Sequence, residues 1–212
     1  MKKTPLSRER VLGCALAMAD EDGLDGLSMR KLADRLGVKA MSLYNHVANK
    51  DEIIDGLVEM VVAEMGLPDS SQPWRQAMEE RAVRAHDVLM RHPWATHAFM
   101  SRVNAGPAML AYVNATLGCL HEAGFSLPVA DHAWNAMDNH IYGFTLQALN
   151  FPFSADEYAE VAKQYLPMIN SDELPYLHQL TALVSRKQHK GVHDFRLGLG
   201  FILDGLASLL AE

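Results

Sequence analysis

The sequence predicts an all-α protein with an N-terminal helix-turn-helix domain of three helices and a C-terminal helical domain. Apolar residues recur at three- and four-residue intervals along most of the 212 residues. The breaks between these periodic segments hold glycine and proline, which end helices, and no alternating pattern of useful length indicates a strand. Between Leu27 and Lys50 a glycine turn joins two short amphipathic segments, which is the layout of a helix-turn-helix.

The first helix of this motif is expected to begin after Ser28, whose hydroxyl can accept a bond from a free backbone amide of the first turn. The apolar positions that form its buried face are Met29, Leu32, Ala33 and Leu36. Gly37 can take the left-handed conformation that closes a helix, and Val38 can then pack back onto it. A tight turn is therefore expected between the two helices.

The second helix is expected from about Ala40 to Val47, with Met41 or Leu43 joining Val47 in the core. Its hydroxyl, amide and imidazole side chains then point outward, where they suit phosphates and base edges; they are Ser42, Tyr44, Asn45 and His46.

The next helix opens with a candidate capping box. Asn49 stands three residues before Glu52, which is the spacing that this motif requires. Lys50 would lie beside the exposed backbone amides of the new helix, so it is a candidate phosphate contact.

Charge is distributed unevenly along the chain. Residues 1–50 hold nine Lys and Arg against six Asp and Glu, a balance of +3, whereas residues 51–212 have a balance of −10, which together give −7. Within 28–50 there are five basic residues and one acid, Asp34. This concentration of positive charge favours DNA binding by the motif. The alternative is a three-helix surface bundle with ordinary solvated charges.

Two stretches of sequence carry a family resemblance. They are V-L-G-C-A-L-A-M-A-D-E-D-G-L-D-G-L-S-M-R-K-L-A-D-R-L-G-V and S-L-Y-N-H-V-A-N-K-D-E-I-I-D-G-L. Over roughly residues 7–65 the chain closely resembles the DNA-binding domain of the tetracycline-repressor family of bacterial transcriptional regulators. In that family the helix with the L-Y-x-H segment enters the major groove.

The resemblance implies which side chains contact DNA. They come from three successive helices and are Arg30, Lys31, Lys39, Ala40, Met41, Ser42, Tyr44, Asn45, His46 and Lys50. Family members differ at four of these positions, so the operator sequence does not follow from the resemblance; the four are Lys39, Ala40, Met41 and Asn45.

The rest of the chain is expected to be nearly all helix. The periodic segments are 51–65, 74–92, 107–123, 128–149, 155–168, 172–187 and 193–211. Turn-forming residues cluster at 66–73, which marks a boundary between domains. We therefore expect a DNA-binding domain at 1–50, a connecting helix at 51–66 and a second domain at 67–212.

This second domain resembles the C-terminal domain of tetracycline repressors through Trp74, the E-A-G-F-S-L turn at 122–127 and the long helix that reaches Gly143. The resemblance implies ligand binding and dimerisation. Tetracycline repressors bind a drug chelated to a divalent metal through a histidine and a glutamate, but Phe99 and Gln147 stand at those positions here. Neither side chain is a good ligand for a hard metal ion, so we expect no such metal site, no cofactor and no role in tetracycline resistance.

The same alignment implies a cavity between helices. Its candidate lining mixes aromatic and polar groups suited to a moderately apolar ligand, and consists of Arg81, Ala85, Phe99, Met100, Arg102, Trp134, Asp138, Asn139 and Gln147. The alternative is that Phe99, Met100 and Trp134 belong to the core.

Other classes of function have less support. Among ten histidines only His189 and His193 have helical spacing, and Gly191 lies between them, so a metal-responsive regulator stays a minor alternative. The chain has no G-x-S-x-G, H-E-x-x-H or glycine-rich phosphate loop, and its two cysteines, Cys14 and Cys119, lie far apart, so we expect no enzyme and no disulfide. Without a signal-peptide pattern or an apolar run long enough to span a bilayer, a cytoplasmic protein with no membrane partner is expected.

The last helix suggests self-association. From Phe195 to Leu210 the segment is apolar almost all round, and such a helix must be buried on all sides. The resemblance implies a homodimer in which the helices at 128–149 and 193–211 form a four-helix bundle with those of a second copy. The alternative is a terminal helix buried within its own domain.

The sequence therefore predicts a ligand-responsive transcriptional regulator, a repressor that a small-molecule inducer releases from a palindromic double-stranded DNA operator. One alternative is a helical small-molecule-binding protein or enzyme that retains a non-functional motif, which would lack sequence-specific DNA affinity. Another is a nucleoid-type protein, which would bind DNA with little sequence preference.

Overall fold

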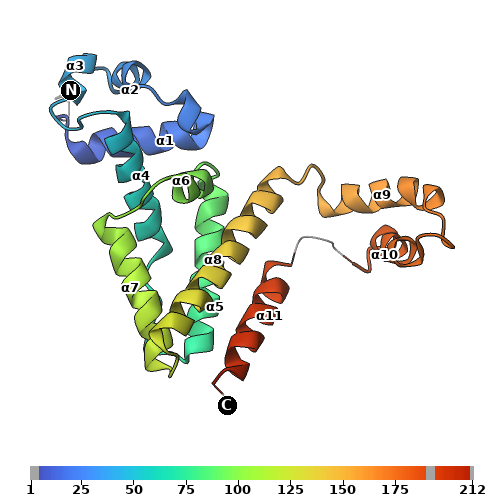
Figure 1. Cartoon of the computed structure of the whole chain (residues 1–212). Helices are drawn as coiled ribbons and strands as arrows, with labels where there is room; N and C mark the ends of the chain where they lie inside the picture. The colour runs from blue at the N-terminus through green and yellow to red at the C-terminus, as the bar shows by residue number, and fades with distance from the viewer. Residues whose placement is uncertain (1–4, 190–193, 211–212) are drawn as a thin grey trace.

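The computed structural model describes residues 5–189 and 194–210, and these residues form only helices and their connections (Figure 1). Three helices at one end make a small unit that we call the head: α1 (Arg8–Gly26), α2 (Met29–Leu36) and α3 (Ala40–Leu43). Helix α4 (Lys50–Met65) runs from the head into a larger helical body (Figure 1). The all-α fold with an N-terminal helix-turn-helix is confirmed.

The turn between α2 and α3 forms as expected. The Ser28 hydroxyl accepts a bond from the Lys31 amide at 3.2 Å and so caps α2. Gly37 ends the helix in the left-handed conformation with φ of 67°. The amide of Val38 then bonds back to the Ala33 carbonyl at 3.0 Å, which satisfies a carbonyl in the last turn of α2.

Helix α3 is shorter than the predicted segment 40–47. Its α-helical part ends at Leu43, and the next residues form a turn in which the His46 amide bonds to the Leu43 carbonyl at 2.8 Å. Leu43 is fully buried and Met41 is 77 % exposed, which decides which of the two belongs to the core.

The cap of α4 also differs in one detail from the expected capping box. The Asn49 side chain accepts from the Glu52 amide at 2.8 Å, as predicted. The Glu52 carboxylate, however, accepts from the amide of Ala48 and not from that of Asn49. The helix still begins at Lys50, because the free amides of its first turn gain an acceptor.

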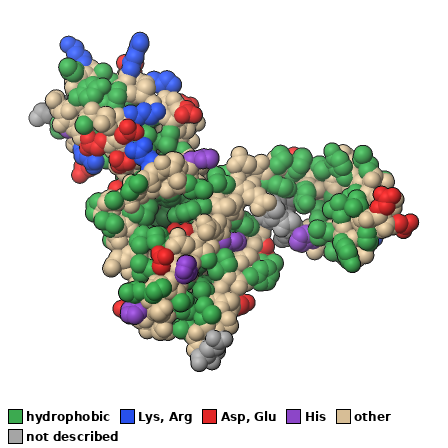
Figure 2. Space-filling view, in the orientation of Figure 1, with side chains coloured by type: hydrophobic (Ala, Val, Ile, Leu, Met, Phe, Trp, Pro, Cys, Tyr) green, Lys and Arg blue, Asp and Glu red, His purple; other side chains and the backbone are tan. Residues whose placement is uncertain are grey.

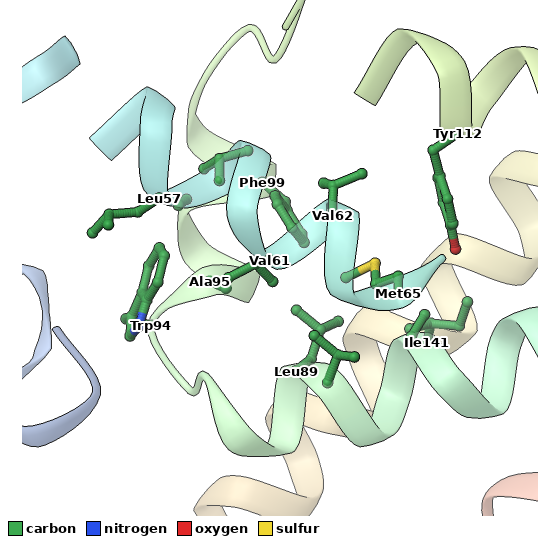
Figure 3. Packing of buried hydrophobic residues seen from close by; sticks show 14 of the residues in the cluster. Leu57, Val61, Val62, Met65, Leu89, Trp94, Ala95, Phe99, Tyr112 and Ile141 are labelled. Atoms are coloured by element: carbon green, nitrogen blue, oxygen red, sulfur yellow. The ribbon is translucent and has the colours of Figure 1, made fainter. Parts of the chain in front are cut away.

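The body surrounds the second half of α4. It contains α5 (Trp74–Arg91), α6 (Ala95–Ser101), α7 (Pro107–Glu122), α8 (Leu127–Asn150) and α11 (Phe195–Ser208). Helix α4 packs against α1 of the head and also against α5, α6 and α7. Figure 3 shows Leu57, Val61 and Met65 of α4 among buried side chains of the body. A movement of α4 would therefore change contacts in both the head and the body.

Helix α6 is absent from the periodic segments that the sequence predicts. Its seven residues lie between two proline-containing breaks, His92-Pro93 and Gly106-Pro107, and so short a segment shows little periodicity. Four of them are nevertheless buried: Ala95, Thr96, Ala98 and Phe99.

Two further helices form an arm that stands away from the body (Figure 1). The arm consists of α9 (Ala155–Tyr165), a short 3₁₀ turn (Leu166–Met168) and α10 (Pro175–Ser185), which pack on one another. Pro167 ends α9 before the predicted residue 168, and Pro175 at its first position starts α10 later than predicted. Many apolar side chains of the arm are exposed, among them Tyr165, Met168, Tyr176, Leu177 and Leu180.

Helix α11 is buried on one side only. Phe195, Leu199 and Leu203 face α5 and α8, whereas Leu197 and Phe201 are 55 % and 68 % exposed. One copy of the chain therefore leaves half of this apolar helix uncovered. The predicted ends at residues 193 and 211 lie outside the described residues.

The crossing of α11 over α8 depends on Gly198. A Cβ at this position would lie 2.6 Å from Cε1 of His140. The His140 ring cannot easily yield, because it donates to the Phe195 carbonyl at 2.9 Å and stacks on the Phe195 ring.

We expect Gly198→Ala to lower the free energy of unfolding by about 1–3 kcal/mol through this overlap. Gly118→Ala in α7 is the matched control, because a Cβ there meets no described atom within 4 Å. Alanine also favours the helix over glycine, so the control should gain up to about 1 kcal/mol. Urea denaturation at one fixed protein concentration measures both, and equal midpoints for the two variants would contradict the prediction.

Candidate nucleic-acid interface and ligand cavity

The side chains predicted to contact DNA lie on one end of the head, and we call them the reading surface. Figure 2 shows several Lys and Arg side chains projecting from this end, away from the body. Seven of the ten are exposed: Arg30, Lys31, Lys39, Ala40, Met41, Tyr44 and Asn45. Ser42, His46 and Lys50 are half-buried.

The cations of the reading surface differ in their partners. Among the described residues no acidic side chain pairs with Arg30, Lys31 or Lys39, so all three remain available to phosphates. Arg35 of the same helix, by contrast, forms a two-pronged ion pair with Glu21 at 2.5 and 2.6 Å. The unpaired cations are thus the ones that the family pattern assigns to DNA.

Lys50 has a structural contact in addition to its predicted one. Its ammonium donates to the carbonyl of Leu24 at 2.8 Å, which ties the start of α4 to the end of α1. An ammonium has three donors, so two remain for a phosphate.

A cavity of about 250 Å³ lies between α6, α7 and α8. Its walls are mainly aromatic and aliphatic side chains with several amides, and consist of Phe99, Asn104, Met109, Val113, Trp134, Asn135, Asp138, Asn139 and Tyr142. The sequence pointed to four of these: Phe99, Trp134, Asp138 and Asn139.

Asp138 is the acid among these wall residues, and donors surround it. It accepts from the Arg81 guanidinium at 2.7 Å, from the Trp134 indole at 2.7 Å and from the Tyr142 hydroxyl at 3.2 Å. Arg81 is fully buried, and its Cζ lies 4.6 Å from the centre of the Tyr112 ring. Burial and the neighbouring charge of Asp138 hold the pKa of Tyr142 well above its ordinary value, so this hydroxyl stays a donor. The cavity therefore presents little net charge to a ligand.

Other predicted lining residues lie elsewhere. Ala85 is in the core and Arg81 reaches the cavity only through Asp138. Met100 is 64 % exposed, and Gln147 is exposed farther along α8. The Arg102 side chain points toward α4, because its guanidinium forms ion pairs with the carboxylates of Asp51 and Asp55 at 3.1 and 2.8 Å.

Several wall residues were not predicted. Asn135 and Tyr142 lie one helical turn from Asn139 and Asp138 on α8, so the helical period could have indicated them. Met109 and Val113 come from α7, and no spacing in the sequence connects that helix to α8.

Metal clusters and membrane spans are absent from the part of the chain that the structure describes. No three His, Cys, Asp or Glu side chains in residues 5–189 and 194–210 are grouped so that they could hold a metal ion. The pair His189 and His193, which carries the minor metal-responsive alternative, falls partly outside the described residues, because His193 is not among them. None of the described helices combines the length and the apolar character that a membrane span requires.

Comparisons with known protein families match both parts of the chain. Residues 11–57 match the family described as bacterial regulatory proteins, tetR family, and residues 67–210 match the tetracyclin repressor-like C-terminal domain.

Curated relatives are regulators. The chain is 30 % identical to the HTH-type transcriptional repressor DrrR1 of Streptomyces coeruleorubidus, over 99 % of this chain and 80 % of that one. It is 28 % identical to the class D tetracycline repressor of Escherichia coli, over 84 % and 88 % of the two chains. A 37 % identical match to an HTH-type transcriptional regulator of Saccharopolyspora erythraea covers 66 % of this chain and 60 % of that one.

Solved structures share the fold over nearly the whole chain. ActR of Streptomyces coelicolor in complex with actinorhodin superposes with a TM-score of 0.80 at 27 % identity, covering 99 % of this chain and all of that one. A single-residue variant of TetR from Acinetobacter baumannii AYE, in complex with minocycline, gives 0.70 at 25 % identity over 96 % and 94 % of the two chains.

Proposed function

Because the chain belongs to the tetracycline-repressor family of bacterial transcriptional regulators, we propose that it represses transcription as a homodimer on a palindromic operator. A small molecule in the cavity would release it from the DNA. In this proposal residues 1–50 bind DNA, 51–66 connect, and 67–212 bind the ligand and dimerise. A regulator of bacterial genes acts in the cytoplasm, and catalysis has no part in the proposal.

The observation that carries DNA binding is the set of cations on the reading surface. Arg30, Lys31 and Lys39 lie there without acidic partners among the described residues, although the chain as a whole has a charge of −7. Met41 and Tyr44 of the reading surface are exposed as well, and an apolar side chain there suits the methyl group of thymine. Both features favour contact with bases and phosphates over simple solvation.

The half-covered α11 supports a homodimer. Leu197 and Phe201 leave an apolar face exposed, and Gly143 on α8 leaves room for close approach, since a Cβ there meets no described atom within 4 Å. Packing the two helices against those of a second copy buries these faces in a four-helix bundle. A two-fold axis then places two copies of α3 for successive major grooves of a palindrome.

The composition of the cavity supports one kind of ligand. Phe99, Trp134 and Tyr142 offer aromatic walls, the amides of Asn104, Asn135 and Asn139 offer donors and acceptors, and Asp138 is already neutralised by Arg81. An uncharged, flat molecule with several oxygen atoms fits this lining. Two similar proteins have been solved in complex with small molecules, actinorhodin and minocycline, which supports a small-molecule ligand for this chain. Phe99 and Gln147 offer neither an imidazole nor a carboxylate to a hard metal ion, so binding should not require a divalent ion.

Glu59 connects the cavity to the head. From α4 its carboxylate accepts the backbone amides of Ala108 and Met109 at 2.6 and 3.2 Å and so caps α7. Met109 lines the cavity, so a ligand that displaces the first turn of α7 also displaces α4. Because α4 packs on α1, the two heads of the dimer would lose the spacing that the operator requires. Linkage requires that operator binding weaken ligand binding by the same factor.

Selection of bound sequences from a random DNA pool at near-physiological salt tests the proposal. We expect a palindrome bound by two chains with a dissociation constant of about 10⁻⁸ M or tighter, together with a steep fall in affinity as salt rises. Flat aromatic compounds are then screened for release of the selected DNA, without and with a chelator. Release that the chelator abolishes would contradict a metal-independent site, and a pool without enrichment would contradict operator binding.

A further inference from the structure

A cluster of polar side chains joins the head to the body and includes none of the residues of the reading surface or of the cavity wall. Asp20 near the end of α1 accepts from the His92 ring at 2.7 Å and from the Trp94 indole at 2.8 Å, both through the same carboxylate oxygen. His92 and Trp94 belong to the corner between α5 and α6. We call Asp20, His92 and Trp94 the inter-domain latch.

The corner is tied to α4 as well. The second nitrogen of His92 lies 3.3 Å from a carboxylate oxygen of Glu64, which also accepts from Arg91 at 3.1 Å. Burial opposes ionisation of Glu64, but the hydrogen bonds from Arg91 and His92 outweigh it and lower its pKa. Since carboxylates only accept, His92 can donate to Asp20 and Glu64 together only as the doubly protonated ring.

The two donors of the latch are buried, whereas its acceptor, Asp20, reaches solvent. His92 and Trp94 are each 6 % exposed, so water cannot easily take the place of Asp20 as the acceptor of their N–H groups. If the head turned away from the body, two buried N–H groups would lose their acceptor at once. The other tether, from Arg102 to Asp51 and Asp55, is different, because both of its carboxylates are largely exposed and such ion pairs contribute little.

We propose that the inter-domain latch fixes the orientation of the head, and that it thereby sets the affinity for the operator and the tolerated spacing of its half-sites without any contact to DNA. Asp20, His92 and Trp94 are positioning residues in this role. The inference rests on the proposed operator binding. It adds that part of the discrimination between operators is located at the junction of α1 with the α5–α6 corner.

Asp20→Ala is the first test, with Glu21→Ala as its matched control. Both changes remove one negative charge from neighbouring positions of α1, but Glu21 pairs within the head, with Arg35, and has no bond to the described part of the body. Trp94→Phe is the second test, since it keeps an aromatic ring while it removes the indole donor together with the five-membered ring that carries it.

The readout is affinity for the selected operator and for versions with one central base pair added or removed. We expect the wild type and Glu21→Ala to discriminate strongly between the three spacings. Asp20→Ala should bind the operator with the native spacing about tenfold more weakly. Its affinities for the three spacings should differ by no more than about threefold, because a head that is less firmly held can adjust its orientation to each spacing. Trp94→Phe should lose about threefold in affinity and part of the discrimination.

Three outcomes are distinct. If the wild type selects no operator, the proposed function itself fails. If Asp20→Ala and Trp94→Phe match Glu21→Ala in affinity and in spacing preference, the latch is refuted while the function stands. Circular dichroism and the mass of the dimer establish folding; if Asp20→Ala does not fold, the Trp94→Phe result alone decides.

Discussion

Replacing Tyr44 and His46 together by alanine should weaken operator binding by about a hundredfold or more. Each side chain lies on or beside α3 at the reading surface, and a lost base or phosphate contact costs about 1–3 kcal/mol. The two losses should add to about 2–6 kcal/mol, and a hundredfold in affinity, which is about 2.7 kcal/mol, lies in the lower part of that range. Titration of the selected operator by fluorescence anisotropy measures the change.

The arm provides a matched control for this variant. Tyr176 and His178 have the same residue types at the same spacing, and Tyr176 is 85 % exposed. Their double alanine variant should bind the operator like the wild type, provided that its mass shows a dimer. If Tyr44→Ala with His46→Ala also loses dimerisation or its melting transition, the two residues are structural, and the reading surface must be reassigned.

Asp138→Ala should destabilise the fold by about 3–5 kcal/mol, because it leaves the buried Arg81 guanidinium without its counter-charge. The Trp134 and Tyr142 donors lose their acceptor at the same time. Urea denaturation at one fixed protein concentration gives the free energy of unfolding, since the midpoint of a dimer depends on concentration.

Two further variants show whether the loss of stability comes from the broken ion pair or from any change of charge on α8. Arg81→Met combined with Asp138→Ala should recover most of the loss, since no charge remains buried. Asp131→Ala removes an exposed acid from the same helix and should stay within about 0.5 kcal/mol of the wild type. A cost for Asp138→Ala below about 1 kcal/mol would mean that water already reaches the Arg81 guanidinium.

The parts of the fold that depend on residues close together along the chain could be predicted from the sequence. Ser28, Gly37 and Asn49 act through hydrogen bonds or backbone angles within four residues, and each forms the cap that its type predicts. The helical period located most other helices. It missed α6, whose seven residues are too few to show a period and whose burial depends on contact with α4 and α8.

The cavity was only partly predictable because its walls come from separate helices. Trp134, Asp138 and Asn139 share one stretch of α8, so family alignment and helical spacing place them together. Arg102 was assigned to the same wall, but its guanidinium pairs instead with two carboxylates of α4. Nothing within the sequence near Arg102 indicates those acids, which precede it by 51 and 47 residues.

The uncovered face of α11 has a consequence for gene control. If Leu197 and Phe201 need a second copy to shield them, the operator-binding species forms by mass action from two chains, and below the dissociation constant of the dimer most chains are free. At low abundance the occupied fraction of operators then varies with the square of the amount of protein made. Small changes in synthesis or degradation are thereby converted into steep changes in transcription, and a twofold fall in the concentration of the regulator reduces occupancy about fourfold.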